Sequence, residues 1–379
     1  MRAAWITTGF ASAEEHDGAA AIHELAREIA SHDDIELTIF SLYHPVNEPQ
    51  YKYHGAKVFS FARTKTISKL EKLKIWRRCI KRFSEEHRTK RFDLIHSMWA
   101  GESGYVASRL SRKYSIPLAV NICGGELAYF PEIKYGSRTK FWQKKFVDRS
   151  FRQAKAVISG SDCITGLLKK YYSCEIYKKI AKIPFGVDEG KFYPGIVVKK
   201  PGDTIKLINI ANVSTVKDHL TMLKALLKVR EKFPDIALLH YGKDEDNVLQ
   251  KMVDSLGLEK NVHLNGFIEY DKVPGILRGA DIFVLSSLYE SQNMSVIEAA
   301  FCGIPVVSTD AGAAKEITGN IVQPCDSNAL AEMLIRTVEN LVDEKRKALA
   351  RIEKLKADYS LKVSAQRFIE LYRSLTANT

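Results

Sequence analysis

The chain has 379 residues, of which 45% are hydrophobic, and a formal net charge of +12. This length suggests about two domains, each large enough for its own core. No apolar run approaches the roughly 18 residues of a membrane span, and acids at Glu14, Glu15 and Asp17 argue against a signal peptide. The six cysteines are scattered without a C-x-x-C pair, which favours reduced thiols in a cytoplasmic protein over a disulfide framework or a zinc site.

Basic residues concentrate in two stretches of the first half. Residues 63–91 hold twelve Lys and Arg against three Glu, and residues 134–155 interleave further cations with Phe and Trp. Apolar residues recur in the first stretch at steps of three and four: Leu70, Leu73, Trp76, Ile80 and Phe83. This spacing predicts an amphipathic helix whose stripe faces the core. The cations are then either simply solvated or attract an anionic membrane or acceptor, whereas nucleic acid is not expected because no binding motif accompanies them.

Strands alternate with helices along the first half, which implies a parallel sheet with right-handed crossovers. The expected strands cover residues 3–7, 35–40, 92–96, 117–122 and 156–159. Besides the basic helices, one helix is expected to carry Ile22, Leu25 and Ile29, and another to cover residues 105–114.

The same alternation restarts in the second half. Strands are expected over residues 205–210, 236–241, 262–264 and 281–285, and helices over 220–232 and 249–256. Residues 195–203 have Pro and Gly at their ends, as a linker has. A last helix is expected from about residue 360 to residue 375.

The segment from Asp281 to Glu316 carries the strongest functional signal and reads DIFVLSSLYESQNMSVIEAAFCGIPVVSTDAGAAKE. A strand that feeds a helix N-terminus offers an anion unpaired amides and a positive dipole end. Glu290 and Glu298 would repel a lone phosphate, but they suit a ligand that also brings hydroxyl groups. The structural alternative is a capping box formed by Ser295 and Glu298, which has no catalytic task.

This segment resembles the E-x7-E signature of retaining group-1 (family 4) glycosyltransferases. The matching positions are Ala280, Asp281, Ser287, Glu290, Glu298, Ala299, Gly303, Pro305, Val306, Val307 and Gly312. The resemblance implies an α/β fold of two Rossmann-like, doubly wound domains facing across a cleft (GT-B), with a C-terminal helix crossing back to the first domain. We expect an acceptor-side domain over 1–188 plus about 360–379, and a nucleotide-sugar-binding domain over 189–359.

The resemblance also implies a donor site. Lys217 matches the family lysine that clamps the diphosphate, and we expect it to neutralise charge on the leaving group. Glu290, the second expected catalytic residue, corresponds to the acid that faces the donor sugar, and Glu298 to the acid that binds ribose hydroxyls. The other expected donor-binding residues are Gly18, Asn212, Gly242, Gly266, Phe267, Ser291, Gln292, Asn293, Met294 and Ser295.

Two departures from the family pattern fall in this donor site. The family arginine of the diphosphate loop is Asn212 here, which predicts a weaker clamp or a shifted donor preference, because asparagine lacks the charged fork of arginine. The family's glycine-rich loop is replaced by residues 291–293. We expect Asn293 to adopt a left-handed conformation in place of glycine.

A third departure lies on the acceptor or sugar side, in the turn Cys-Gly-Gly-Glu at residues 123–126. Cys123 stands where the family has a histidine, whereas Gly124 and Glu126 match. A thiol cannot reproduce the proton-donor and charge behaviour of an imidazole. His96 ends a strand and is interpreted as a buried structural histidine.

The implied activity is transfer of a sugar from a UDP- or GDP-sugar to an acceptor hydroxyl, with retention, in bacterial surface polysaccharide or glycolipid assembly. The departing phosphate is thought to take the acceptor proton in this family, so neither a strong protein base, a metal nor another cofactor is expected. Two alternatives stay open: a catalytically impaired, glycosyltransferase-like binding partner, and a nucleotide-sugar epimerase.

The expected partners are a nucleotide sugar donor and a glycan or lipid-linked acceptor. The basic helices over 63–91 and 134–155 are expected to contact a membrane surface, which would place this cytoplasmic protein at the inner face of the membrane.

Overall fold

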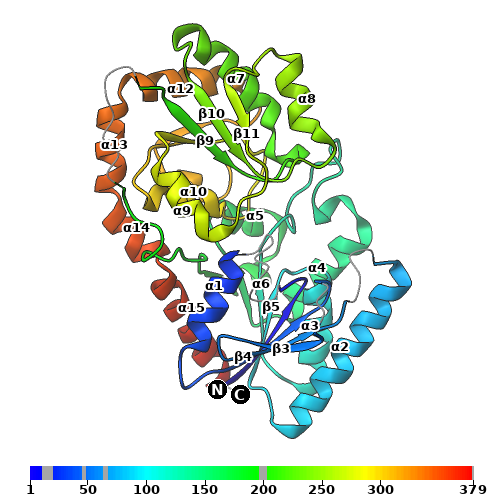
Figure 1. Cartoon of the computed structure of the whole chain (residues 1–379). Coiled ribbons are helices and arrows are strands. Elements are labelled where there is room, and N and C mark those ends of the chain that lie inside the picture. The colour runs from blue at the N-terminus through cyan, green and yellow to red at the C-terminus, as the bar shows by residue number, and fades with distance from the viewer. Residues whose placement is uncertain (11–19, 45–47, 63–66, 196–202, 378–379) are drawn as a thin grey trace. The chain divides into compact units, whose positions relative to one another are not determined.

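The computed structural model describes residues 1–10, 20–44, 48–62, 67–195 and 203–377. The chain divides into two compact units, Met1–Gly186 with Leu361–Thr379, and Val187–Ser360. Each is a parallel-sheet α/β unit (Figure 1). Gly18, residues 63–66 of the first basic stretch and most of the linker-like segment lie outside the described residues.

Within its described residues the first unit has an eight-stranded sheet in the order β3-β4-β2-β1-β5-β6-β7-β8. The strands are β1 (Arg2–Thr7), β2 (Glu36–Ser41), β3 (Gln50–Tyr53), β4 (Ala56–Ser60), β5 (Leu94–Met98), β6 (Leu118–Asn121), β7 (Ala156–Ser159) and β8 (Ile180–Lys182). Neighbouring strands are parallel except β3 and β4, an antiparallel pair that was not predicted. The connections change direction between β1 and β5, as in a doubly wound sheet.

The helices of the first unit are α1 (Ala20–Ala30), α2 (Lys69–Thr89), α3 (Glu102–Tyr114), α4 (Phe141–Gln153), α5 (Asp162–Tyr171), α6 (Cys174–Tyr177) and α15 (Leu361–Thr376). The second basic stretch is helical over a shorter range than predicted, because α4 begins only at Phe141. The helices α1 and α15 pack together on one face of the sheet (Figure 1).

The last helix, α15, belongs to the first unit, as the sequence predicted. Its Tyr372 hydroxyl accepts a hydrogen bond from Trp5 Nε1 at 3.1 Å and lies 2.6 Å from His96 Nδ1. Burial lowers the pKa of His96 to about 3, so the ring is neutral. His96 is therefore a buried structural histidine, as predicted.

The core face of α2 differs from the predicted stripe. Ile75, Cys79 and Phe83 are buried, whereas Leu70 and Leu73 are 74% and 48% exposed. Leu70 and Ile75 are five residues apart and therefore point about 140° away from each other around the helix. The prediction was wrong for the first turn of α2, which carries exposed leucines among its lysines.

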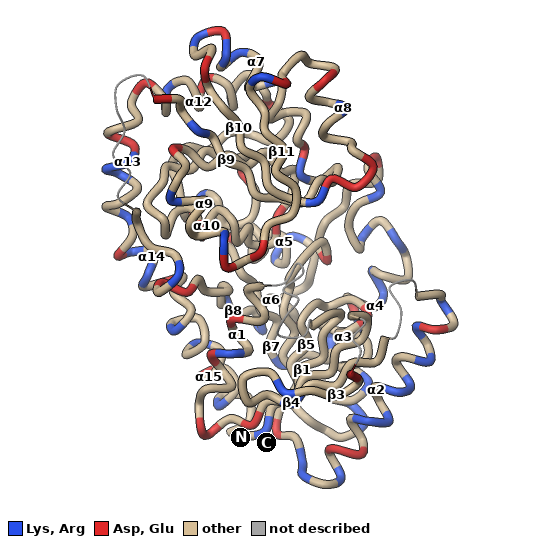
Figure 2. The backbone as a smooth tube through the Cα atoms, viewed as in Figure 1, with Lys and Arg blue, Asp and Glu red and all other residues tan. Residues whose placement is uncertain are grey.

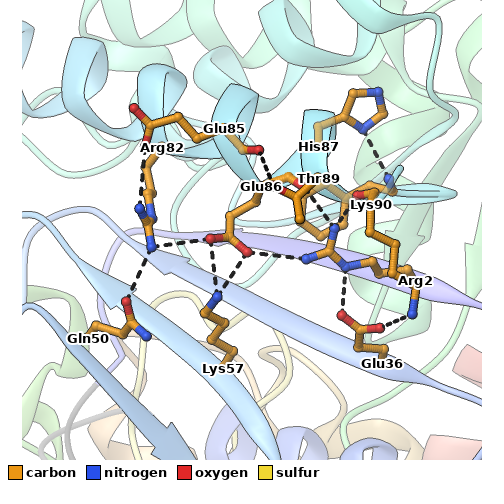
Figure 3. Close-up of polar contacts among 11 residues, drawn as sticks. Arg2, Glu36, Gln50, Lys57, Arg82, Glu85, Glu86, His87, Thr89 and Lys90 are labelled. Carbon is orange, nitrogen blue, oxygen red and sulfur yellow. Dashed lines mark hydrogen bonds and ion pairs between the residues drawn. The ribbon is translucent and has the colours of Figure 1, made fainter.

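The other end of α2 is fastened to the sheet by an ion-pair network (Figure 3). Arg2 Nη1 donates to the Glu86 and Lys90 carbonyl oxygens at the end of the helix, and the Glu86 oxygen also accepts the Lys90 amide at 3.1 Å. The Glu86 carboxylate in turn receives Arg2, Lys57 and Arg82 at 3.0–3.3 Å. These cations are thus engaged inside the unit.

The second unit has a six-stranded parallel sheet within its described residues, in the order β11-β10-β9-β12-β13-β14. The strands are β9 (Lys206–Ile210), β10 (Ala237–Tyr241), β11 (Val262–Leu264), β12 (Ile282–Leu285), β13 (Val306–Thr309) and β14 (Asn320–Val322). The helices are α7 (His219–Lys232), α8 (Val248–Ser255), α9 (Val273–Arg278), α10 (Met294–Phe301), α11 (Ala314–Ile317), α12 (Ser327–Glu339), α13 (Leu341–Ala350) and α14 (Ile352–Tyr359). Two apolar cores, one on each face of the sheet, hold these layers together.

Candidate functional site

The carboxyl ends of β9 and β12 form the switch point of the second sheet. From β9 the chain continues to β10 and β11 on one side, and from β12 to β13 and β14 on the other. Open parallel sheets bind ligands at such a point, because the two following loops diverge there. Asn209 at the end of β9 donates from Nδ2 to the Val284 carbonyl oxygen of β12 at 2.8 Å, which fixes the two strand ends.

The loops after these two strands bring Lys217 and Glu290 together. Lys217 Nζ lies 2.6 Å from Glu290 Oε1, and the Ser287 hydroxyl donates to the same oxygen at 2.7 Å. A second hydrogen bond joins the two loops, since the Ser286 hydroxyl donates to the Lys217 carbonyl oxygen at 2.9 Å. The two predicted catalytic residues therefore form one ion pair at the switch point.

This ion pair is only partly shielded from solvent. The side chains of Lys217 and Glu290 are 26% and 12% exposed, so both ends remain accessible to a ligand. A phosphate arriving here would compete with the carboxylate for the ammonium group.

Asn293 occupies the left-handed conformation predicted for it, with φ of 60°. Its Nδ2 donates to the Ala311 carbonyl oxygen and its Oδ1 accepts from the Ala313 amide, both at 2.9 Å. The side chain that replaces glycine thus ties the loop after β12 to the turn after β13. The departure from the family pattern adds hydrogen bonds to this loop.

The capping box considered for Ser295 and Glu298 is not formed. The helix α10 begins after Asn293, and no side chain caps it. Glu298 instead lies buried and accepts a hydrogen bond from the Tyr270 hydroxyl at 3.1 Å. Burial raises the pKa of Glu298 to about 7, against the lowering effect of that hydrogen bond. Its contact is thus with Tyr270 rather than with the pair formed by Lys217 and Glu290.

Three more predicted residues come together where the loops after β9, β10 and β11 meet. Asn212 Oδ1 accepts from the Lys243 amide at 2.9 Å, and the Gly242 amide donates to the Gly266 carbonyl oxygen at 2.8 Å. Gly242 has φ of 154°, and a Cβ there would overlap the Ala211 carbonyl oxygen. Only glycine therefore fits at position 242. The side-chain oxygen of Asn212 is occupied by the hydrogen bond from the Lys243 amide.

Lys243 is a cation that the sequence prediction passed over. Its ammonium lies 5.0 Å from the ring centroid of Phe267, a predicted donor-binding residue that is 52% exposed. The sequence signal was present, since Lys243 directly follows the essential Gly242. An exposed aromatic ring beside a cation at the carboxyl edge suits a base and its phosphates.

The remaining predicted donor residues line the loop before α10 and its first turn. Ser291, Met294 and Ser295 are half-buried, and Gln292 is buried with its carbonyl oxygen accepting the Ala313 amide at 3.2 Å. Gly18 lies outside the described residues. Within the described residues, no group of three or more His, Cys, Asp or Glu side chains is arranged to hold a metal ion.

In the first unit, Glu126 organises the predicted glycine turn after β6. Its carboxylate accepts the amides of Gly124 at 2.7 Å, Ala100 at 3.1 Å and Cys123 at 3.3 Å. Burial raises the pKa of Glu126 while these amides oppose the rise. Burial also raises the pKa of the Cys123 thiol, so it stays neutral. Glu126 thus has both oxygens engaged by the backbone.

Trp99 lies against the same turn. It follows β5 with φ of 70°, a left-handed conformation that is uncommon for a bulky residue, and its carbonyl oxygen accepts the hydroxyls of Ser97 and Ser103. A Cβ on Gly124 would lie 3.4 Å from the indole nitrogen. The sequence places Trp99 near a strand end, but only the fold brings it to residues 123–126.

Solved structures similar to this chain define its fold. A sucrose-phosphate synthase from Thermosynechococcus elongatus aligns over 100% of this chain and 99% of its own, with a TM-score of 0.83 and 18% identity. A lipopolysaccharide outer core galactosyltransferase aligns over 100% of both chains, with a TM-score of 0.70 and 13% identity. The two parallel α/β units are therefore those of a GT-B fold, as the sequence predicted.

Family models match nearly the whole chain. The model of family 4 glycosyltransferases matches residues 18–191, and the model of group 1 glycosyl transferases matches residues 197–356. The chain belongs to the group-1, family 4 glycosyltransferases.

Curated relatives align with parts of the chain. Mannosylfructose-phosphate synthase of Agrobacterium fabrum is 33% identical over 35% of this chain and 33% of its own length. A putative colanic acid biosynthesis glycosyltransferase of Escherichia coli is 28% identical over 59% of this chain and 58% of its own. The match to a GDP-mannose-dependent phosphatidylinositol monomannoside mannosyltransferase of Corynebacterium glutamicum, 25% identical, covers 51% and 55%. The matched segments thus span between a third and three-fifths of these relatives.

Proposed function

We propose that the protein transfers a sugar from a nucleoside diphosphate sugar to an acceptor hydroxyl, with retention at the anomeric carbon. One observation carries this proposal: Lys217 and Glu290 meet at 2.6 Å at the switch point of the second sheet. A scaffold has no need for an accessible ammonium at that point, whereas a diphosphate leaving group needs a cation. Membership of the family supports the same activity.

In the proposed reaction the bond between the anomeric carbon and the diphosphate oxygen breaks, and the acceptor oxygen bonds to the same face of that carbon. The acceptor proton passes to the departing diphosphate. Lys217 exchanges Glu290 for the diphosphate and stabilises the charge that develops there. Glu290, released from the lysine, faces the sugar, and Glu298 binds the ribose hydroxyls. In this scheme no metal ion is required.

The donor is proposed to be a UDP- or GDP-sugar. Phe267 and Lys243 are proposed to meet the base and the phosphates, since an exposed ring lies beside a cation there, and Asn212 stands at the position of the family arginine. The acceptor is proposed to be a growing bacterial surface polysaccharide or a glycolipid. The names of the relatives that act in colanic acid biosynthesis and on a phosphatidylinositol mannoside support this class.

A membrane surface is proposed as a further partner, through α2 and α4. Lys and Arg residues occur along the whole length of α2 (Figure 2). Exposed apolar side chains lie at the start of both helices: Leu70, Leu73, Phe141 and Trp142. Both helices return the chain to a parallel strand, so both begin at the carboxyl edge of the first sheet. Among the described residues, no helix is long and apolar enough to cross a bilayer.

The first prediction tests the donor site with a panel of UDP-, GDP- and ADP-sugars. One class of nucleotide sugar should raise the unfolding temperature of the wild-type protein, because a ligand that binds only the folded state stabilises it. Lys217→Ala should reduce this shift and lower transfer by about 100-fold or more. Glu290→Gln should lower transfer more than it lowers nucleotide affinity.

Two outcomes would contradict parts of this proposal. If no nucleotide sugar shifts the unfolding temperature, the protein is not a nucleotide-sugar enzyme. If one binds but neither transfer nor hydrolysis of that donor is detected with any glycan or lipid acceptor, the protein is a binding partner. The exposed Lys228→Ala change on α7 serves as a matched control for the loss of a lysine and should leave both measurements unchanged.

A further inference from the structure

The buried carboxylate of Glu298 accepts a hydrogen bond from the Tyr270 side chain. The tyrosine belongs to a single 3-10 turn, Tyr270–Lys272, which leads into α9. Its hydroxyl donates to Glu298 Oε1 at 3.1 Å. The carboxylate is thus held in one orientation by a side chain from another loop of the carboxyl edge.

The ring of Tyr270 contacts two further side chains, those of Phe192 and Lys191. Its centroid lies 5.7 Å from that of the buried Phe192, and the Lys191 ammonium lies 5.8 Å from the ring. Lys191 is in turn paired with Asp271 at 3.1 Å, next to Tyr270 in sequence. These contacts favour the ring orientation in which the Tyr270 hydroxyl meets Glu298.

The surroundings of Glu298 otherwise favour its neutral form. Burial raises the pKa of Glu298 to about 7. At the C-terminal end of α10, the helix that carries Glu298, burial raises the pKa of the Cys302 thiol to about 12, so this thiol is uncharged at neutral pH. The helices packed against α10 present Glu316 and Tyr359, which are hydrogen-bonded to each other at 2.7 Å. The charge of Arg278, on α9, opposes the rise in the pKa of Cys302. The hydrogen bond from the Tyr270 hydroxyl favours the ionised form of Glu298.

We propose that Tyr270 is a positioning residue of the donor site, which orients Glu298 and favours the carboxylate form that ribose hydroxyls require. A carboxylate accepts hydrogen bonds at both oxygens, whereas a protonated acid spends one oxygen on its own proton. Tyr270 therefore sets how well the nucleotide binds near neutral pH. The inference rests on the proposed donor function, because it assigns Glu298 to the ribose.

The second prediction concerns Tyr270→Phe and uses UDP, GDP and ADP as probes. Calorimetric titrations from about pH 6 to about pH 8.5 should show wild-type affinity for one nucleotide rising through neutral pH as Glu298 ionises. In Tyr270→Phe this rise should move to higher pH, with about a tenfold loss of affinity near pH 7 that shrinks above pH 8. Titrations in two buffers of different ionisation enthalpy should show that nucleotide binding releases a proton.

Two control variants separate the possible results. Glu298→Gln cannot ionise, so its titrations reveal the proton changes of the nucleotide phosphates alone. Tyr193→Phe removes a hydroxyl from a half-exposed tyrosine of the same unit and should behave as wild type. Unfolding temperatures measured without nucleotide show whether each variant is folded.

Each outcome bears on one idea. Wild-type affinity and pH dependence in Tyr270→Phe would overturn the positioning role, and the donor site would stand if Glu298→Gln still lost affinity. An equal loss at every pH would also overturn it, because it would indicate packing rather than control of the carboxylate. If wild type binds none of the three nucleotides, the proposed function itself fails.

Discussion

Gly312 shows at the residue scale how closely the loops of the candidate site pack. Its φ is 59°, and a Cβ there would lie 2.8 Å from Asn293 Oδ1 and 2.9 Å from Glu290 Cβ. The turn after β13 therefore approaches the loop of Glu290 only because it carries no side chain. This close contact helps to fix the loop that carries Glu290 and Asn293.

The third prediction follows from that contact. Gly312→Ala should destabilise the second unit by about 1–3 kcal/mol and weaken nucleotide-sugar binding, because the new methyl group pushes the loop of Glu290 away. Thermal unfolding and donor titration measure the two effects. Gly257→Ala provides the matched control, since Gly257 also has a positive φ but nothing lies near its Cβ. Equal effects of the two changes on donor affinity would show that strain, rather than displacement, is responsible.

At the scale of elements, α2 and α4 combine two kinds of surface. Their middle parts pack inward, where Trp76 of α2 lies 5.7 Å from Phe146 of α4. Their first turns point outward, with Phe141 and Trp142 64% and 67% exposed and the Lys145 ammonium within 4.2–5.2 Å of both rings. Aromatic rings beside cations suit the interface of an anionic bilayer.

The fourth prediction tests this surface with vesicles. Binding to phosphatidylcholine vesicles containing phosphatidylglycerol should exceed binding to phosphatidylcholine alone and should weaken with salt. Replacing both Phe141 and Trp142 by Ala should lower partitioning by about tenfold. Val342→Ala, which removes an 86% exposed apolar side chain from α13, should have no effect. If the double variant binds vesicles as well as the wild type does, the contact depends on charge alone. If the wild type does not bind vesicles, the proposed membrane contact is refuted.

At the scale of the whole molecule, each unit contains buried neutral histidines. Burial lowers the pKa of His96 and His219 to about 3 and that of His240 to about 4. Between these values and the ordinary pKa of about 6.5, the unfolded chain binds more protons than the folded one, so folding stability falls as the pH is lowered. Glu298 acts in the opposite sense. Its pKa is raised in the folded protein, so the stability that it contributes falls as the pH rises toward 7.

The fifth prediction is therefore a loss of stability on mild acidification. The unfolding temperature should decrease from about pH 6.5 to about pH 5, because three buried histidines outweigh the two buried glutamates whose pKa is raised, Glu126 and Glu298. Glu298→Gln removes one of the two opposing contributions, so its unfolding temperature should fall more steeply over the same interval. An unfolding temperature that is constant from about pH 6.5 to pH 5 would contradict the prediction.

Much of the fold and part of the site could be predicted from the sequence. The alternation of buried strands and helices predicted both parallel units, since each strand of a parallel sheet is apolar along its length. Lys217 and Glu290 were predicted to lie in the loops that follow two strands, and they lie in the loops after β9 and β12. The hydrogen bond from Tyr270 to Glu298 and the core face of α2 could not be predicted, because they depend on which elements pack together.

The sequence alone determined the fold class, the family and the residues at the carboxyl edge, because these depend on periodicity and on motifs local in the chain. Only the tertiary structure decided which of those residues touch. It joined Lys217 to Glu290 across 73 positions, and it buried Glu298 against Tyr270. Contacts of this kind depend on strand order and helix packing, which bring distant segments together and are not written in any local stretch of residues.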